Sequence, residues 1–357
     1  MSSSQTAEMG CAGLLERWGQ TMGAMLISEG LEDDEPAATE RFDPYLQHVE
    51  MPFSAVFYPL GFPVRVTTNC REILEAAEES WGAFRQQLSI PPFAMTLGVM
   101  EDGATDCPPA PISRAQRNVV VRIADAANFY VIDLLRGLSF GWVNAATVSH
   151  RAYLRYHILE AAALCQIANR YAAPIHAACV AWAGRGILLC GDSGAGKSTL
   201  AFACARAGWT YVTDDASFLL HRESGRRIHG NCHMVRLRAS AAELFEEVAG
   251  RPVTPRLTGK PSIEIPMSAM AEIHIAPESD VEYVVFLNRG GSGVQELVPH
   301  SRDVMRSYVH KNLHGMEEIR SGQIASVERL LTAQVLELRY HDLNWAVGRL
   351  ERLVRES

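Results

Sequence analysis

The segment Gly191-Asp192-Ser193-Gly194-Ala195-Gly196-Lys197-Ser198 decides how this chain is interpreted. It follows the pattern G-x-x-x-x-G-K-S, in which the glycines let successive backbone N–H groups face one anion and the lysine adds a point charge. A short apolar run, 186–190, precedes it, and a run of helix formers, 199–206, follows it. Strand, glycine loop and helix is the context that this phosphate-binding motif, the P-loop, requires.

The P-loop predicts a nucleotide site and gives its residues different tasks. Lys197 is expected to meet the β- and γ-phosphates, and the hydroxyl of Ser198 is a suitable ligand for Mg²⁺. The residues expected to contact the phosphates of ATP are Gly191, Asp192, Ser193, Gly194, Ala195, Gly196, Lys197, Ser198 and Thr199.

Length and composition describe a globular protein and exclude several classes. The 357 residues favour two domains, and 48% of them are hydrophobic while 21% are charged. A net charge of -8 argues against a general binder of nucleic acid or of anionic membranes. No uncharged apolar stretch reaches the roughly 18 residues of a spanning helix. Eight scattered cysteines without a C-x-x-C pair indicate buried thiols in a reducing cytoplasm, not disulfides or a zinc site.

The chain is predicted to hold an N-terminal mixed α+β domain, 1–147, and a C-terminal α/β P-loop domain, 148–357. The N-terminal region offers no chemical constellation, so its role is not readable. Helices are expected there at 8–28 and 71–86, and strands at 53–58, 63–67, 94–100, 118–123, 128–133 and 138–143, with a loop at 101–113.

In the C-terminal region a helix at 148–171 is followed by a strand hairpin that enters the P-loop, with the tight turn Gly184-Arg185-Gly186 between its strands. A long loop with four prolines is expected at 251–268. Further strands are expected at 175–182, 209–213, 217–221, 227–230, 234–238, 272–275, 282–288 and 335–340, and helices at 240–249, 301–309, 322–333 and 343–354.

Two acidic residues, Asp214 and Asp215, close the expected strand 209–213 just after the P-loop helix. Beside a phosphate loop, one carboxylate can hold Mg²⁺ and the other can accept a proton from an attacking hydroxyl. The alternative is that Asp215 only caps a turn. The position next to the P-loop favours the functional interpretation.

His176 precedes Lys197 on the predicted hairpin. A single histidine in an apolar strand is more often a core residue than a functional one. The hairpin changes this estimate because it would bring His176 beside the phosphate loop.

Several other polar residues are weaker candidates. Arg256 and Lys260 either close over the phosphates as a mobile basic loop or belong to an ordinary solvated surface. Glu264 is a second carboxylate near the metal or, as we favour, a plain strand residue. Lesser cationic candidates are Arg236, Arg238 and Arg289.

Together, His176, the P-loop and the pair Asp214-Asp215 resemble the catalytic domain of bacterial HPr kinase/phosphorylase. The resemblance covers roughly 172–350 and is strongest over 175–216. It implies a fold similar to that of phosphoenolpyruvate carboxykinase, which departs from the usual parallel NTPase sheet. It also implies a catalytic group of His176, Lys197 and Asp215, in which Asp215 deprotonates a serine hydroxyl and His176 assists. Ser198 and Asp214 would serve the metal.

The sequence departs from this family in two places. Thr199 stands where the family usually has glutamate after Lys-Ser, and the signature Leu-Glu-Ile-Arg-Gly is missing, with only a faint echo at 263–266. That signature belongs to the phosphorylase reaction and to HPr docking. The resemblance therefore indicates a divergent relative, an HPr-kinase-like enzyme with another substrate.

The predicted function is a cytoplasmic Mg²⁺–ATP-dependent kinase that phosphorylates a serine of a protein or peptide, with no nucleic-acid or membrane partner. One alternative is a kinase of a small hydroxyl metabolite, which a pocket closed by 251–268 would favour over an open groove. Another is a non-catalytic nucleotide sensor. The resemblance suggests a homo-oligomer.

Overall fold

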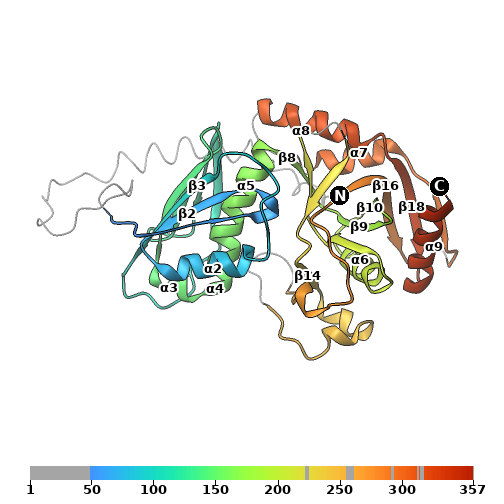
Figure 1. The fold of residues 1–357 in the computed structure, drawn as a ribbon, viewed down its shortest axis with the longest axis horizontal. Coiled ribbons are helices and arrows are strands. Elements are labelled where there is room, and N and C mark those ends of the chain that lie inside the picture. The colour runs from blue at the N-terminus through green and yellow to red at the C-terminus, as the bar shows by residue number, and fades with distance from the viewer. Residues whose placement is uncertain are drawn as a thin grey trace, which may run out of the picture. The chain divides into compact units, whose positions relative to one another are not determined.

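The computed structural model describes residues 49–221, 225–254, 261–290, 293–311, 313 and 317–356. They belong to one compact unit, 44–357. The helix expected at 8–28 lies outside the described residues, and the domain boundary at 147 stays a prediction. The architecture is mixed α/β with two large sheets (Figure 1).

The first sheet has seven strands in the order β1-β2-β3-β7-β6-β5-β4. The ladders β2–β3 and β3–β7 are parallel and the others are antiparallel. The strands are β1 Phe53–Phe57, β2 Val64–Thr68, β3 Phe93–Met100, β4 Ile112–Gln116, β5 Val119–Ile123, β6 Phe129–Asp133 and β7 Leu138–Asn144. All the expected strands of this region are confirmed. The exposed strand β4 was not predicted, and its first two residues fall within the expected loop 101–113.

Helices pack on this first sheet and bury their apolar sides in one core. Ile73 of the first helix and Leu154 and Ile158 of the later ones are all buried there. The helix expected at 148–171 is present as consecutive segments, one of them π-helical. These elements are α2 Arg71–Trp81, α3 Ala145–Ser149, α4 Arg151–Tyr153, η2 Leu154–Glu160 and α5 Ala161–Arg170.

The second sheet contains the glycine loop's strand, β10, in its interior. Its order is β11-β9-β10-β16-β13-β12-β8, and β16 also pairs with β18, which pairs with β17. β10 is antiparallel to β9 and parallel to β16, so the predicted hairpin is confirmed. The strands are β8 Ala172–Ile175, β9 Ala178–Trp182, β10 Arg185–Cys190, β11 Thr210–Thr213, β12 Ser217–Leu220, β13 Arg227–Gly230, β16 Glu278–Arg289, β17 Glu296–Pro299 and β18 Gln334–Tyr340.

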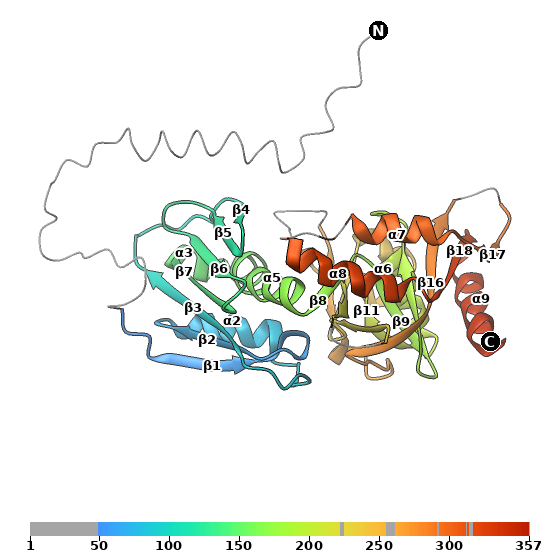
Figure 2. The same ribbon diagram turned by 90° about the horizontal axis from the view of Figure 1, so that it is seen from above.

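Helices cover both faces of the second sheet (Figure 2). Because side chains alternate along a strand, Ile187 and Leu189 of β10 enter the core with one helix pair, and Leu188 and Cys190 enter the core with the other. The first pair is α6 Lys197–Arg206 and α9 Leu343–Glu356, and the second is α7 Arg302–His310 and α8 Glu317–Leu330.

Two short connections cross between distant strands of the second sheet. Residues 176–177 join β8 to β9, and residues 214–216 join β11 to β12. Such segments span only about 10–15 Å, so the sheet must curl until these strands approach each other. β8 pairs with β12 and β9 pairs with β11, which makes the two connections run side by side. Ser217 Oγ donates to the carbonyl oxygen of Ala177 at 2.9 Å and links them.

Several predictions in the C-terminal region are wrong in detail. The helix expected at 240–249 is two 3₁₀ turns, η3 Ala239–Glu243 and η4 Glu246–Val248. Phe245 between them is extended (φ -136°, ψ 115°) and packs edge-on against Phe202 at 4.8 Å, so a tertiary contact overrides local propensity. Residues 272–275 form a single bridge from Ile275 to Tyr211 instead of a strand.

Part of the expected loop 251–268 is a strand. β14 Met234–Leu237 pairs with β15 Ile263–Pro266 in a small antiparallel sheet. β15 was expected only as the strand around Glu264 and was otherwise assigned to the loop. β17 was not predicted, because its sequence Glu-Leu-Val-Pro does not alternate between apolar and polar residues.

Candidate functional site

The glycine loop, residues 191–196, joins β10 to α6 as predicted. Gly196 precedes the first helical residue with φ +97°, and a Cβ there would lie 3.0 Å from Tyr340 Oη. Both the left-handed backbone and the close approach require glycine. The loop therefore ends where the N–H groups of the first turn of α6 are still without partners in the helix.

Lys197 folds back over this loop. Its Nζ donates to the carbonyl oxygens of Gly191 at 2.7 Å and Asp192 at 3.3 Å, and the side chain is buried. Burial lowers the pKa of Lys197, and the charge of Asp215 opposes that effect. The ammonium group is thus held at the loop by backbone oxygens instead of extending into solvent.

Tyr308 on α7 connects the glycine loop to His176. Its hydroxyl accepts from the N–H of Gly191 at 3.3 Å and lies 2.5 Å from the carbonyl oxygen of His176 and 3.0 Å from that of Gly191. The ring packs edge-on against Phe286. Nothing in the local sequence points to Tyr308, because a tyrosine on a helix far along the chain carries no motif.

Asp214 follows β11 and is buried below the loop. Its Oδ1 accepts from the hydroxyl of Tyr211 at 3.2 Å, and its Oδ2 accepts from the N–H of Arg236 at 3.1 Å. Burial, together with the charge of Asp215, raises its pKa to about 6. Ser198 Oγ donates to its carbonyl oxygen at 3.3 Å. The two residues predicted to serve the metal therefore lie next to each other.

Asp215 and His176 lie on the two side-by-side connections and form a pair. Nδ1 of His176 lies 3.0 Å from Oδ1 of Asp215, and both side chains are exposed. His176 is on the connection between β8 and β9 and not within a strand, which corrects the predicted continuous strand 175–182. The three residues predicted as catalytic, His176, Lys197 and Asp215, line the same cavity.

This cavity, which we call the loop cavity, has a volume of about 720 Å³. It brings together most of the predicted site residues with the C-terminal end of β14. Its polar lining consists of His176, Ser193, Lys197, Ser198, Thr199, Asp214, Asp215, Arg236, Arg238, Ser240, Glu243, Ser262 and Arg289.

The two arginines of the β14 region differ in their surroundings. Arg238 is exposed and donates to Ser193 Oγ at 3.3 Å, so its guanidinium lies over the glycine loop. Arg236 is mostly buried, with Nε 2.9 Å from Glu264 Oε1 and a guanidinium nitrogen 3.8 Å from Glu160. Arg236 is therefore held by carboxylates, while Arg238 is placed for an anion on the loop.

Glu264 is engaged by Arg236 and by the hydroxyl of Tyr156, which agrees with the plain interpretation better than with a metal role. Burial alone would raise the pKa of Glu264, but the charge of Arg236 holds it below its usual range. Arg256 and Lys260 lie outside the described residues.

Other predicted properties concern the chain as a whole. The thiols of Cys179, Cys190, Cys204 and Cys232 are buried, as expected, whereas Cys70 and Cys165 are only partly buried and Cys107 is exposed. Among the described residues, no three histidine, cysteine or carboxylate side chains gather closely enough to hold a metal by themselves. No helix in the described ranges has the length and apolar character to cross a membrane.

Comparisons with known proteins add little to this geometry. No protein-family model matches the chain, and no curated protein matches it. Among solved structures, the HPr(Ser) kinase/phosphatase from Coxiella burnetii matches 52% of this chain and 99% of its own, with 14% identity and a TM-score of 0.27. A likeness this low carries no argument about function.

Proposed function

We propose that this protein is a Mg²⁺–ATP-dependent kinase that transfers the γ-phosphate to a hydroxyl group. The proposal rests on one observation: the glycine loop with Lys197, the buried Asp214 and the exposed Asp215–His176 pair all line the loop cavity. A phosphate cradle and an exposed carboxylate that can accept a proton are the parts that phosphoryl transfer to a hydroxyl needs.

The glycine loop supplies the phosphate site. The N–H groups of the loop and of the first turn of α6 provide donors for phosphate oxygens, reinforced by the helix dipole. Lys197 would exchange its carbonyl partners at Gly191 and Asp192 for the β- and γ-phosphates. Arg238, already over the loop at Ser193, adds a second positive charge where negative charge develops during transfer.

The residues around Ser198 fit a magnesium ion. The hydroxyl of Ser198 and the carboxylate of Asp214 are hard oxygen donors of the kind that Mg²⁺ prefers. Both oxygens of Asp214 already accept hydrogen bonds, so we assign Ser198 to the ion directly and Asp214 to its surroundings. Mg²⁺ held there would offset the negative charge of the phosphates.

Asp215 is the proposed general base. Its carboxylate takes the proton of the acceptor hydroxyl as the new O–P bond forms, and the bond from the γ-phosphorus to ADP breaks. His176, at 3.0 Å, fixes the direction in which the carboxylate points. Following the family resemblance, we assign a serine of a protein or peptide as the acceptor.

Transfer of label from γ-labelled ATP tests the proposal. The protein is incubated with Mg²⁺ and with serine-containing peptides or lysate proteins, beside the variant Lys197→Ala and the matched surface variant Lys311→Ala. We expect labelled peptide or protein with the wild type and with Lys311→Ala, and none with Lys197→Ala. Label found only in small molecules would show that the phosphate acceptor is a metabolite and not a peptide. Label that persists at full rate in Lys197→Ala would refute the site.

A further inference from the structure

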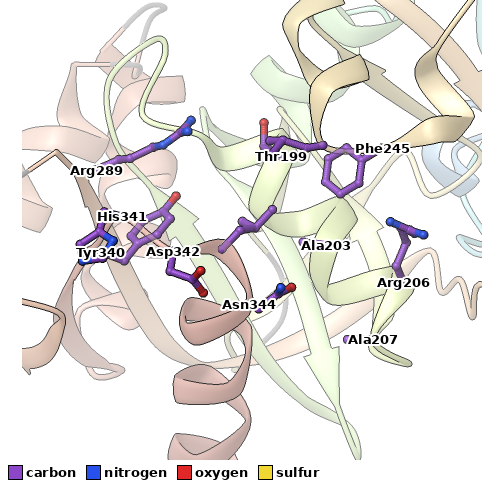
Figure 3. Close-up of a pocket in the computed structure, with 12 residues that line it drawn as sticks. Thr199, Ala203, Arg206, Ala207, Phe245, Arg289, Tyr340, His341, Asp342 and Asn344 are labelled. Carbon is purple, nitrogen blue, oxygen red and sulfur yellow. The ribbon is translucent and has the colours of Figure 1, made fainter.

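A second cavity, which we call the side cavity, lies beside the loop cavity between α6 and the start of α9 (Figure 3). Its volume is about 430 Å³, within the range of roughly 300–1,000 Å³ typical of small-molecule sites. None of the residues assigned above to the phosphates or to proton transfer lines it, except Thr199. The proposed kinase chemistry therefore leaves it unexplained.

The side cavity adjoins the loop cavity. Thr199, Leu244 and Arg289 line both, which places the two cavities next to each other at these three residues. Residues of α6 line both cavities. Lys197 at the start of α6 belongs to the loop cavity, and Ala203, about 9 Å further along at 1.5 Å per residue, belongs to the side cavity.

The lining of the side cavity combines apolar surface with a few polar groups. Ala203, Leu244 and the aromatic rings of Phe245 and Tyr340 provide apolar walls. The ring of Phe245 is fixed from two sides, by Phe202 at 4.8 Å and by the guanidinium of Arg206 at 5.7 Å. A fixed aromatic ring next to small side chains suits a flat heteroaromatic ligand.

Polar groups at the start of α9 complete the lining. Asp342 Oδ1 accepts from the N–H of Trp345 at 2.6 Å, which fixes the carboxylate at the helix N-terminus. Asn344, two residues further along the chain, presents an amide that can both donate and accept, and Figure 3 shows both side chains on the side of the cavity opposite Thr199. A carboxylate accepts from hydroxyls or an amine, and an amide can pair with a purine edge.

We propose that the side cavity binds the base and ribose of a purine nucleoside triphosphate whose phosphates lie on the glycine loop. This inference rests on the proposed function and names the part of the substrate that the loop cavity does not hold. Arg289, at the boundary of the two cavities, lies where the α-phosphate would pass between them.

Calorimetric titration with Mg²⁺ and ATP, GTP, CTP or inorganic tripolyphosphate tests the inference on the full chain. Ala203→Trp fills the side cavity, Asn344→Ala removes its amide, and Asp342→Ser keeps a helix cap while removing the charge. Arg352→Ala, an exposed position on α9 outside the lining, is the control.

We expect the dissociation constant for ATP or GTP to rise about tenfold in both Ala203→Trp and Asn344→Ala. The first variant blocks the space for the purine ring, and the second removes one hydrogen bond to it. The constant for tripolyphosphate should stay within about twofold, because this ligand has no nucleoside. A parallel loss of tripolyphosphate binding, unchanged ATP binding in all three variants, or equal affinity for CTP and ATP would each overturn the inference.

The inference and the proposed function fail in different ways. Tight ATP binding that depends on Asn344, without any phosphate transfer, would refute the kinase and leave the nucleoside site in place. Transfer that persists with unchanged ATP affinity in the three side-cavity variants would leave the kinase and refute the nucleoside site.

Discussion

The Nδ1 atom of His176 lies 3.0 Å from Oδ1 of Asp215, although the two residues belong to different strand connections. The β8–β9 connection carries His176 and the β11–β12 connection carries Asp215. Pairing of β8 with β12 and of β9 with β11 aligns these connections. The register of four strands therefore builds the pair that we assign to proton transfer.

Replacing Asp215 by asparagine removes the proposed base at nearly constant shape. We expect the rate of phosphate transfer to fall by about 10²–10⁴, the usual contribution of a general base, while ATP affinity changes little. Steady-state kinetics and titration with ATP measure the two quantities. Asp303→Asn, an exposed aspartate on α7, is the matched control. Transfer at a near-normal rate in Asp215→Asn would exclude this residue as the base.

Tyr308→Phe removes one hydroxyl and keeps the ring against Phe286. The hydroxyl is the contact between α7, Gly191 and the backbone of His176, so its loss should cost about 1–2 kcal/mol of unfolding free energy. We also expect slower transfer at saturating ATP, because the loop and His176 lose their shared anchor. Denaturant unfolding and kinetics check both. A variant with wild-type stability and rate would show that the hydroxyl anchors nothing.

Replacement by methionine should have different effects at Arg236, which lies on β14, and at Arg238, which follows it. The first should lower stability and the second should weaken ATP binding. Arg236→Met removes the cation that pairs with Glu160 and Glu264, and burial already raises the pKa of Glu160. Breaking such a pair costs about 3–5 kcal/mol of unfolding free energy. Arg238→Met removes an exposed charge and should alter stability little, but it should weaken ATP binding.

Urea unfolding and ATP titration of both arginine variants separate these effects. Adding Glu264→Gln to Arg236→Met should restore part of the lost stability, because the remaining carboxylate charge is then removed. Equal stability of the two single variants would contradict the assignment of Arg236 to the buried ion cluster.

The buried carboxyl of Asp214 should make stability depend on pH. Its pKa in the folded chain is about 6, against an ordinary value of 3.8, so the folded state holds a proton between these values that the unfolded state has released. Stability from this group is therefore present below about pH 4 and is lost as the pH rises to about 6.

The variant Asp214→Asn measures this effect, since an amide does not titrate. Between about pH 4 and pH 7 the wild type should lose on the order of 2 kcal/mol of unfolding free energy relative to the variant. Urea unfolding at the two pH values gives the numbers. A difference between the two proteins that is constant across this range would contradict the raised pKa.

Local patterns predicted the parts of this molecule that local sequence determines. The glycine loop, its strand and its helix follow from residues 186–206, and the hairpin correctly placed His176 near that loop. Tyr308 was not predictable, because its contact depends on how α7 packs on the sheet. The break of the helix at Phe245 likewise results from a contact with Phe202 that no short window contains.

Tertiary packing also explains why only one of the two candidate arginines, Arg238, lies over the glycine loop. Arg236 and Arg238 were equal candidates in the sequence, since both lie beside an expected strand. Only the fold brings Glu160 and Glu264 to the first and the glycine loop to the second. Charge can be read from a sequence, but the partner of a charge is a property of tertiary structure.

The two crossing connections are short, and this restricts the movement of Asp215 and His176. Segments 176–177 and 214–216 are anchored at both ends by paired strands, so neither can reorganise without breaking a ladder. The proposed proton acceptor and its partner are thus preorganised before any substrate arrives. Because the two residues are already ordered, binding does not lose conformational entropy at them. The free-energy barrier to phosphate transfer is lower for this reason.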